Sequence, residues 1–193
     1  MANYRARMPM AAKRTVSDGV ATYSGGLAIG KLIQVGSTPT VADVKLYGDD
    51  VVAESVVAFT SSAITLSITT IPTQVAKLIF NADVTGDAGA EEIKWSDKNP
   101  DYVGFGFITT EMVDNEDKIK VTWFPKVKFA LPTETYDTKG ESVTFGTPSI
   151  TATAYMDETV NEWKHDYYCA TADAAVAKLK ELCGITSGTT SGT

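Results

Sequence analysis

The sequence predicts a mainly β protein, an antiparallel β-sandwich or barrel with one or two short flanking helices. Apolar and polar residues alternate strictly over residues 62–69 and again in several other stretches, and a period of two is typical of a half-buried strand. The expected strands lie far apart in the chain, and they do not alternate with helices. This order favours an antiparallel fold over a doubly wound parallel sheet.

The length and composition predict one globular domain. The chain has 193 residues, of which 44% are hydrophobic and 21% charged, and this is enough for one sizeable core. No apolar run reaches the roughly 18–20 residues of a membrane span. We expect an N-terminal arm over residues 1–25, a domain over 26–184 and a flexible tail over 185–193. The arm shows no sustained period and would need a partner surface to be ordered, and the tail is rich in Ser, Gly and Thr.

The first half of the domain contains three expected strands and one helix. Residues 27–35 and 41–47 have strand patterns on either side of a Gly-Ser-Thr-Pro turn. After the strand at 62–69, apolar residues recur with helical spacing. These residues are Ile71, Val75, Leu78 and Ile79. Thr69 or Thr70 is the expected N-cap, and Pro72 suits the first turn.

The second half begins with a long polar loop over residues 81–102 and a strand over 104–112. The longest expected strand follows at 118–131. Pro125 lies in the middle of it, and a proline there indicates an edge, a bulge or a kink because it cannot donate a ladder hydrogen bond. A further long β segment is expected over 141–156, with a bend at its Gly-Thr-Pro sequence.

The chain closes with a short aromatic strand at 164–170 and a helix. Thr171 is the expected N-cap of this helix, and Gly184 is well placed just after its last residue. The two cysteines, Cys169 and Cys183, are too few for a disulfide framework and fit no zinc pattern. We therefore expect two free, buried thiols and synthesis in a reducing cytoplasm.

The charge pattern argues against tight nucleic-acid binding. The net charge is −7, whereas proteins that bind DNA irrespective of sequence release counterions with Lys and Arg. One face of the strand at 118–131 does carry four lysines, Lys118, Lys120, Lys126 and Lys128. We interpret this face as a solvated strand face that discourages aggregation. A basic binding stripe and lysine–carboxylate contacts between subunits remain the alternatives.

The residues give little indication of catalysis, and we expect no enzyme, no cofactor and no metal. His165 is the only histidine, and no Gly-x-Ser-x-Gly motif accompanies it. Acidic clusters occur near residues 49–54, 91–92 and 114–117, all in expected loops, where charge usually serves solvation. The last cluster could attract calcium, but it lacks the 12-residue EF-hand pattern. Gly104-Phe105-Gly106 is not followed by the third glycine of a dinucleotide site.

The order of these segments resembles the phi13-type major tail protein family of long-tailed bacteriophages. One block comprises VKLYGDD at 44–50, FTS at 59–61, AITLSIT at 63–69 and Ile71-Pro72. A second comprises GFGFI at 104–108, IKVTWFPKVKF at 119–129, ESVTF at 141–145 and ITATA at 150–154. The resemblance covers roughly residues 28–183. It depends on the order of structural segments and includes no catalytic motif.

The resemblance implies a structural protein of the virion, made in the bacterial host cytoplasm and located in the tail. Such subunits form hexameric rings that stack into a hollow tail tube around a tape-measure protein. A tail terminator and distal tail proteins would be further partners. DNA would pass through the tube without specific binding, and the acidic chain suits such a conduit. No membrane partner is implied.

The segment at 48–61 is our candidate for a stacking contact between subunits. We expect it to be a long, acidic loop that is too apolar to be left in solvent, so that a neighbouring subunit would cover it. The alternative is that the loop folds onto its own core. The candidate interface residues are Asp49, Asp50, Val51, Val52, Glu54, Val56, Val57 and Phe59.

Three other functions remain open from the sequence. Another tail component or a secretion-type tube protein would have a similar composition. In a β-sandwich carbohydrate-binding module, Trp95, Trp123 and Trp163 could form a stacking platform, although Trp123 lies in the apolar phase of its strand, which favours the core. A hydrolase is the weakest alternative, because no set of nucleophile and base is evident.

Overall fold

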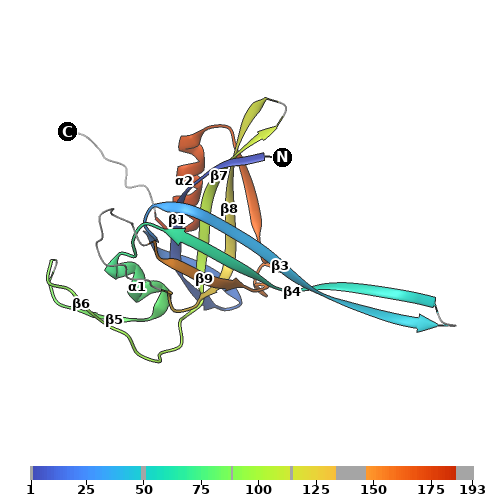
Figure 1. Cartoon of the computed structure of the whole chain (residues 1–193), viewed down its shortest axis with the longest axis horizontal. Coiled ribbons are helices and arrows are strands. Elements are labelled where there is room, and N and C mark those ends of the chain that lie inside the picture. Colours follow the sequence, from blue (N-terminus) through green and yellow to red (C-terminus); the bar gives the residue numbers. More distant parts are fainter. Residues whose placement is uncertain (1, 49–50, 88, 114, 134–146, 186–193) are drawn as a thin grey trace, which may run out of the picture.

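The computed structural model describes residues 2–48, 51–87, 89–113, 115–133 and 147–185. It confirms a mainly β, antiparallel fold with two short helices (Figure 1). The elements in chain order are β1 (Ala2–Ser17), β2 (Val20–Ala28), β3 (Leu32–Gly48), β4 (Val51–Ile68), α1 (Thr73–Phe80), β5 (Asp83–Thr85), β6 (Glu92–Lys94), β7 (Val103–Val113), β8 (Glu116–Phe129), β9 (Ser149–Ala154), β10 (His165–Cys169) and α2 (Ala172–Leu182).

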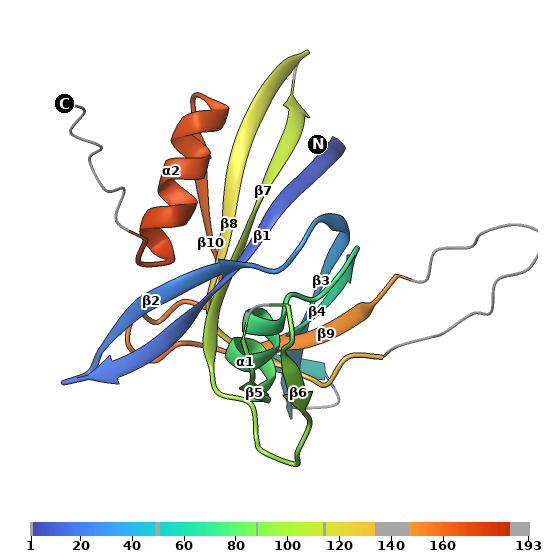
Figure 2. The same cartoon turned by 90° about the vertical axis from the view of Figure 1, so that its left-hand side faces the viewer.

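One large sheet contains eight of the ten strands, in the order β2-β1-β7-β8-β9-β4-β3, with β10 also paired to β8. Every pairing is antiparallel. The sheet bends, so that β3, β4 and β9 cross the long strands β1, β7 and β8 (Figures 1 and 2). β5 and β6 form a separate small hairpin inside the expected loop at 81–102.

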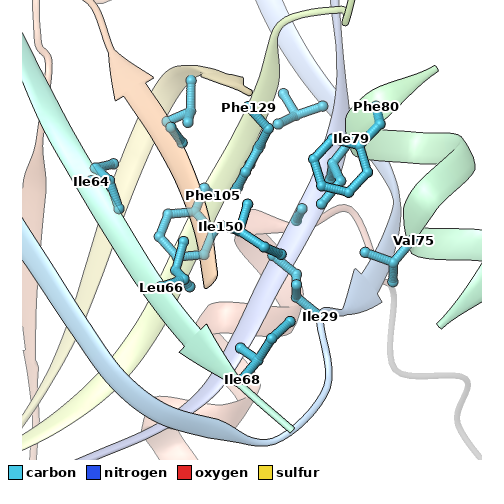
Figure 3. Close-up of a cluster of buried hydrophobic side chains, with 14 of the residues drawn as sticks. Ile29, Ile64, Leu66, Ile68, Val75, Ile79, Phe80, Phe105, Phe129 and Ile150 are labelled. Carbon is cyan, nitrogen blue, oxygen red and sulfur yellow. The ribbon is translucent and has the colours of Figure 1, made fainter. Parts of the chain in front are cut away.

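The main hydrophobic core lies between the two crossing parts of the sheet (Figure 3). Ile64, Leu66 and Ile68 alternate along β4 and are at most 1% exposed, as their period of two predicts. They face a layer of aromatic side chains that includes Phe105 and Phe129. α1 covers this core with its own buried side chains, Val75, Ala76, Ile79 and Phe80.

A second, smaller core lies under α2. Leu179 and Cys183 of the helix end are fully buried there against Val121 and Trp123 of β8. The side chain of Thr171 accepts a hydrogen bond from the backbone N–H of Ala174 at 3.2 Å, so the predicted N-cap is confirmed.

The C-terminal end of α2 depends on one glycine. Gly184 has a φ of +68°, and its N–H donates to the carbonyl of Glu181 while that of Ile185 donates to Lys180. This pair of bonds is the Schellman motif, in which glycine takes the left-handed position. The predicted helix end is therefore confirmed.

The N-cap predicted for α1 is wrong by two or three residues. Pro72 occupies the cap position, without a side-chain hydrogen bond. Thr69 is instead held by its backbone, because its N–H donates to the carbonyl of Lys31 at 3.0 Å. A proline suits the start of a helix, because it has no backbone N–H that would be left without a hydrogen-bond partner.

The expectation of an N-terminal arm over residues 1–25 differs from the structure. These residues form β1 and most of β2, and β1 is an interior strand paired with β2 on one side and β7 on the other. Asp18 and Gly19 both have positive φ and join the two strands by a tight turn. Ala11 and Ala12 are fully buried, so this segment packs within its own sheet.

Pro125 lies at a β-bulge, as predicted. Phe105 pairs with Phe124 and Val103 pairs with Val127, so β8 uses one residue more than β7 across this interval. The opposite edge of β8 also changes its partner here, from β10 to β9. The missing N–H of the proline therefore interrupts no regular ladder. β8 is shorter than β3 and β4, so the prediction that it is the longest strand is wrong. Of the β segment predicted at 141–156, β9 is described and residues 141–146 lie outside the described part.

Candidate assembly surface

A two-stranded ribbon projects from the body of the protein (Figure 1). It consists of residues 41–48 of β3 and 51–59 of β4, paired from Val41 and Phe59 to Gly48 and Val51; we call this ribbon the arm. The prediction of a loop over 48–61 is therefore wrong, because β4 already begins at Val51. Valine is frequent here, and β-branched residues favour strands.

Within the described residues, the strands of the arm pair only with each other. β4 pairs with β9 only between Ser62 and Ser67, so beyond that point its second edge has no partner among the described residues. An irregularity in the register after Thr40 separates the arm from the sheet, and a second lies near its end. A two-stranded ribbon alone is marginally stable in water, which makes an additional contact favourable.

One face of the arm is apolar and exposed. Val44 lies opposite Val56, and Ala42 lies opposite Ala58. The two valines are 67% and 62% exposed, and both alanines are exposed as well. Four apolar side chains thus form one patch on a projecting element, with Glu54 at the next position of the same face; such a patch is typical of a surface that contacts another molecule.

The opposite face of the arm is mixed. Asp43 lies opposite Val57 and Lys45 opposite Ser55. The Lys45 ammonium lies 3.1 Å from Asp43, and the Ser55 hydroxyl donates to the same carboxylate at 3.3 Å. These exposed contacts orient the strands but add little stability, because exposed ion pairs contribute about 0–1 kcal/mol.

The structure divides the predicted interface residues into two groups. Glu54, Val56 and Val57 are exposed on the arm. Phe59, at the base of the arm, is partly buried by its own chain, because its ring stacks on Trp163 with the centroids 4.6 Å apart. The alternative that the segment folds onto its own core therefore holds for Phe59.

The remaining predicted interface residues are only partly described. Val51 and Val52 occupy the end of the ribbon, in backbone register with Gly48 and Tyr47. Asp49 and Asp50 lie outside the described residues. Sequence reasoning missed the β3 half of the patch, although Ala42 and Val44 alternate with charged residues and so indicate an apolar strand face.

The candidates for chemistry have structural partners. His165 lies 2.8 Å from a carboxylate oxygen of Glu162 and stacks on the ring of Tyr167. The described part of the chain contains no group of three or more potential metal ligands. In the acidic cluster near residue 116, Asp117 accepts a hydrogen bond from the hydroxyl of Tyr4 at 2.7 Å, and Asp114 lies outside the described residues.

The three tryptophans do not form a single exposed platform. Trp123 is 4% exposed in the core under α2, as its strand phase predicts. Trp163 packs against Phe59 and the main core, whereas Trp95 is 47% exposed beside Phe80. A carbohydrate-binding platform of these residues is therefore not assembled.

The lysine face of β8 is used within the chain. Lys120 forms an ion pair with Glu111, and Lys126 lies 2.6 Å from Glu158. The ammonium groups of Lys126 and Lys128 also lie over the ring of Tyr102, at 5.1 and 5.4 Å from its centre. These contacts favour a structural role for the lysines over a basic binding stripe.

The most buried ion pair holds the far end of β1. The Arg14 guanidinium donates two hydrogen bonds to Asp157, at 2.7 and 3.0 Å, and the two side chains are 6% and 0% exposed. Burial alone raises the pKa of Asp157, but the hydrogen bonds from Arg14 and Thr159 outweigh it and lower the pKa below 3.8. The pair is therefore ionised at neutral pH.

Both cysteines are free thiols in the described part of the chain. Cys183 is fully buried, and burial raises its pKa to about 12. Cys169 is only partly buried, which differs from the expectation of two buried thiols, because β10 borders solvent beyond its single partner strand.

Comparison with known proteins gives no family assignment. No family model and no curated protein matches the chain. Among solved structures, the fold is similar to the tube-terminating cap of the anti-feeding prophage, determined by cryo-EM, with a TM-score of 0.47 and 9% identity over 74% of this chain and 86% of that chain. No helix in the described part of the chain is long and apolar enough to cross a membrane.

Proposed function

We propose that this chain is a structural protein of a bacteriophage virion and forms the tail tube of a long-tailed phage. Its subunits would form hexameric rings that stack into a hollow conduit around a tape-measure protein. The observation that carries the proposal is the arm. It extends beyond the body and presents exposed valines, so another subunit has a surface to cover.

The free strand edges support an assembling protein. Among the described residues, β3 pairs only with β4, and β2 only with β1. Unpaired edges favour association with further strands. An arm that contacts a different surface on the next subunit makes a head-to-tail contact, and such contacts generate rings or open-ended stacks. The resemblance to major tail proteins over two blocks of the sequence supports the tube among such assemblies.

The charge of the chain supports the role of a conduit for DNA. The net charge of −7 gives DNA no general reason to bind. Three of the four lysines that could have formed a binding stripe, Lys120, Lys126 and Lys128, already contact carboxylates or an aromatic ring. A tail terminator and distal tail proteins would cap the ends of the tube, and the virion tail would be the location of the mature protein.

Shortening the arm tests the proposal. Residues 42–58 are replaced by Asn-Gly, which joins two paired strand positions with a tight turn and keeps Phe59 on Trp163. The intact protein should form rings and tubes with a central hole in negative-stain micrographs at high concentration. The shortened protein should keep its melting temperature but no longer stack. Tubes formed equally well without the arm would refute its role, and single rings that never stack would instead favour a terminating component.

A further inference from the structure

A cleft opens between the beginnings of β1 and β3, where the sheet does not close on itself. It has a volume of about 310 Å³. Residues 4–6 of β1 form one wall and residues 33–37 of β3 the other, while Phe107, Thr109 and Phe124 from β7 and β8 contribute to its lining. We refer to this space as the cleft.

Both walls of the cleft are strand edges without partners in the described part of the chain. β2 pairs with β1 only from Met10 onward, so residues 4–7 of β1 have β7 on one side alone. β3 is paired only with β4, so its outer edge at residues 33–37 is also open. An open edge of this kind can bind an extended peptide as an additional strand.

The side chains in the cleft include groups that lack a partner. Thr109 is 7% exposed, and its hydroxyl has no hydrogen-bond partner. A buried polar group left unpaired costs about 1–3 kcal/mol, so the cleft contains a site for an additional polar group. Ile33 is also 54% exposed at the wall, where the register between β3 and β4 shifts.

The cleft also carries uncompensated positive charge at Arg5, because the other two cations in its lining are paired with carboxylates. Arg5, Lys120 and Lys164 line it, and none of its described lining residues is acidic. Lys164 lies 2.9 Å from Asp166 and Lys120 pairs with Glu111, so both ammonium groups are held in place from outside the lining. Arg5 forms no ion pair within the described residues.

The end of the arm has the complementary charge. Residues 43–54 contain four acidic residues and one lysine, a net charge of 1 − 4 = −3; two of the four, Asp49 and Asp50, lie outside the described residues. The arm is extended, has open edges and carries exposed valines that match the apolar wall of the cleft. Its own chain cannot use this match, because β3 runs from the cleft toward the arm and the arm projects away from the body (Figure 1).

We propose that the cleft binds the acidic arm of a second copy of this chain. A strand edge of the arm would pair with the open edge of β3, and a carboxylate of the arm would approach Arg5. The contact is head-to-tail, because arm and cleft are different surfaces, and it can therefore repeat along a stack. This inference deepens the proposed function by naming the surface that receives the arm.

Photo-crosslinking locates the receiving surface directly. A benzophenone amino acid replaces Val56 in the full-length protein, and a mixture of unlabelled and ¹⁵N-labelled subunits is irradiated. We expect crosslinked peptides from two different copies, joining the arm to residues 33–37 or to the segment around Arg5. The same amino acid at Ala177, which is exposed on α2, should give no crosslink to these peptides.

Two outcomes would overturn the inference: crosslinks between copies that map elsewhere, or no crosslinks between copies at all. Negative-stain micrographs of the same samples show, independently of the crosslinks, whether tubes have formed. Tubes with crosslinks outside the cleft would agree with the proposed function and would exclude the cleft as the surface that receives the arm. Crosslinks in the cleft of an assembly that is not tubular would support the cleft and contradict the tail-tube function.

A charge exchange tests the electrostatic part. Glu54→Arg and Arg5→Glu should each lower the yield of the cleft crosslink about 5-fold or more, because each opposes like charges. The double variant in one chain restores complementarity between copies and should recover most of the yield. Lys77→Glu, on the exposed face of α1, is the control with the same change in net charge as Arg5→Glu. A double variant as weak as the singles would contradict this pairing of charges.

Discussion

Replacing the valines of the arm by threonine separates assembly from folding. Val44→Thr and Val56→Thr keep the β-branched shape and the strand preference of valine, while each adds a hydroxyl to the exposed patch. Because the side chains are 67% and 62% exposed in the single chain, the free energy of unfolding of the monomer should change by less than about 0.5 kcal/mol.

The effect on assembly follows from the exposed area. Fully burying a valine contributes about 1.5–3 kcal/mol, and roughly two-thirds of each side chain remains to be buried by a partner. Each valine then contributes about 1–2 kcal/mol to the contact, equivalent to a factor of about 5–30 in the critical concentration for assembly. The two residues are cross-strand neighbours, so their effects will not be strictly additive.

Sedimentation of assembled protein against total concentration measures this critical concentration, and chemical denaturation of dilute protein measures stability. Val160→Thr is the matched control, because that valine is 51% exposed outside the arm and its replacement should leave assembly unchanged. If both arm variants assemble at the wild-type concentration, the apolar face of the arm is not a contact, and the argument from its exposure is wrong.

Three further predictions concern the body of the protein. Gly184→Ala should lower the free energy of unfolding by about 1–3 kcal/mol through its left-handed backbone alone, and further because the added methyl group would clash with a carbonyl of β2. Gly19→Ala is the comparison, because Gly19 also has a positive φ but open space around it. In thermal unfolding, Gly19→Ala should show only the backbone effect. Asp157→Asn should cost about 3–5 kcal/mol at pH 7 by leaving a buried arginine unpaired. The pKa of Asp157 is lowered in the folded state. The contribution of its carboxylate to the free energy of unfolding is therefore present above the unfolded pKa of about 4, and it is lost as the pH falls through the folded pKa. In urea titrations, the stability difference between wild type and Asp157→Asn should shrink below about pH 4. Cys183, whose pKa burial raises to about 12, should react with an aromatic disulfide only on unfolding, whereas Cys169 should react in the native protein; equal rates for both thiols would contradict the packing under α2.

The sequence predicted the elements in which burial of one face requires apolar residues at regular intervals. The alternation at 62–69 survives as the core-facing end of β4 because Ile64, Leu66 and Ile68 are all buried. The helix ends at Thr171 and Gly184 were predictable because capping depends on local geometry. Pro125 was interpretable for the same reason, since a missing N–H has a local consequence.

The elements that the sequence did not predict lack a regular pattern of buried residues. The arm is exposed on both faces, and its register shifts near each end, so its valines show no strict alternation. β1 gave no strand signal because its buried residues, 9–12, are consecutive and so show no period of two. The Asp18-Gly19 pair was the available indication of a hairpin.

The receiving surface was also beyond sequence reasoning. The cleft combines Arg5 and Thr109 with Ile33 and Lys164, which come from four separate parts of the chain. Only the bending of the sheet brings them together, and no local pattern encodes that proximity.

The central claim is that this chain assembles through its arm into a hollow tube. Negative-stain electron microscopy of the purified full-length protein over a range of concentrations tests it most directly. We predict rings and stacked tubes with a central hole for the intact protein, and no stacked tubes for the protein with the shortened arm. A protein that stays monomeric at every concentration, or tubes that form without the arm, would contradict the account.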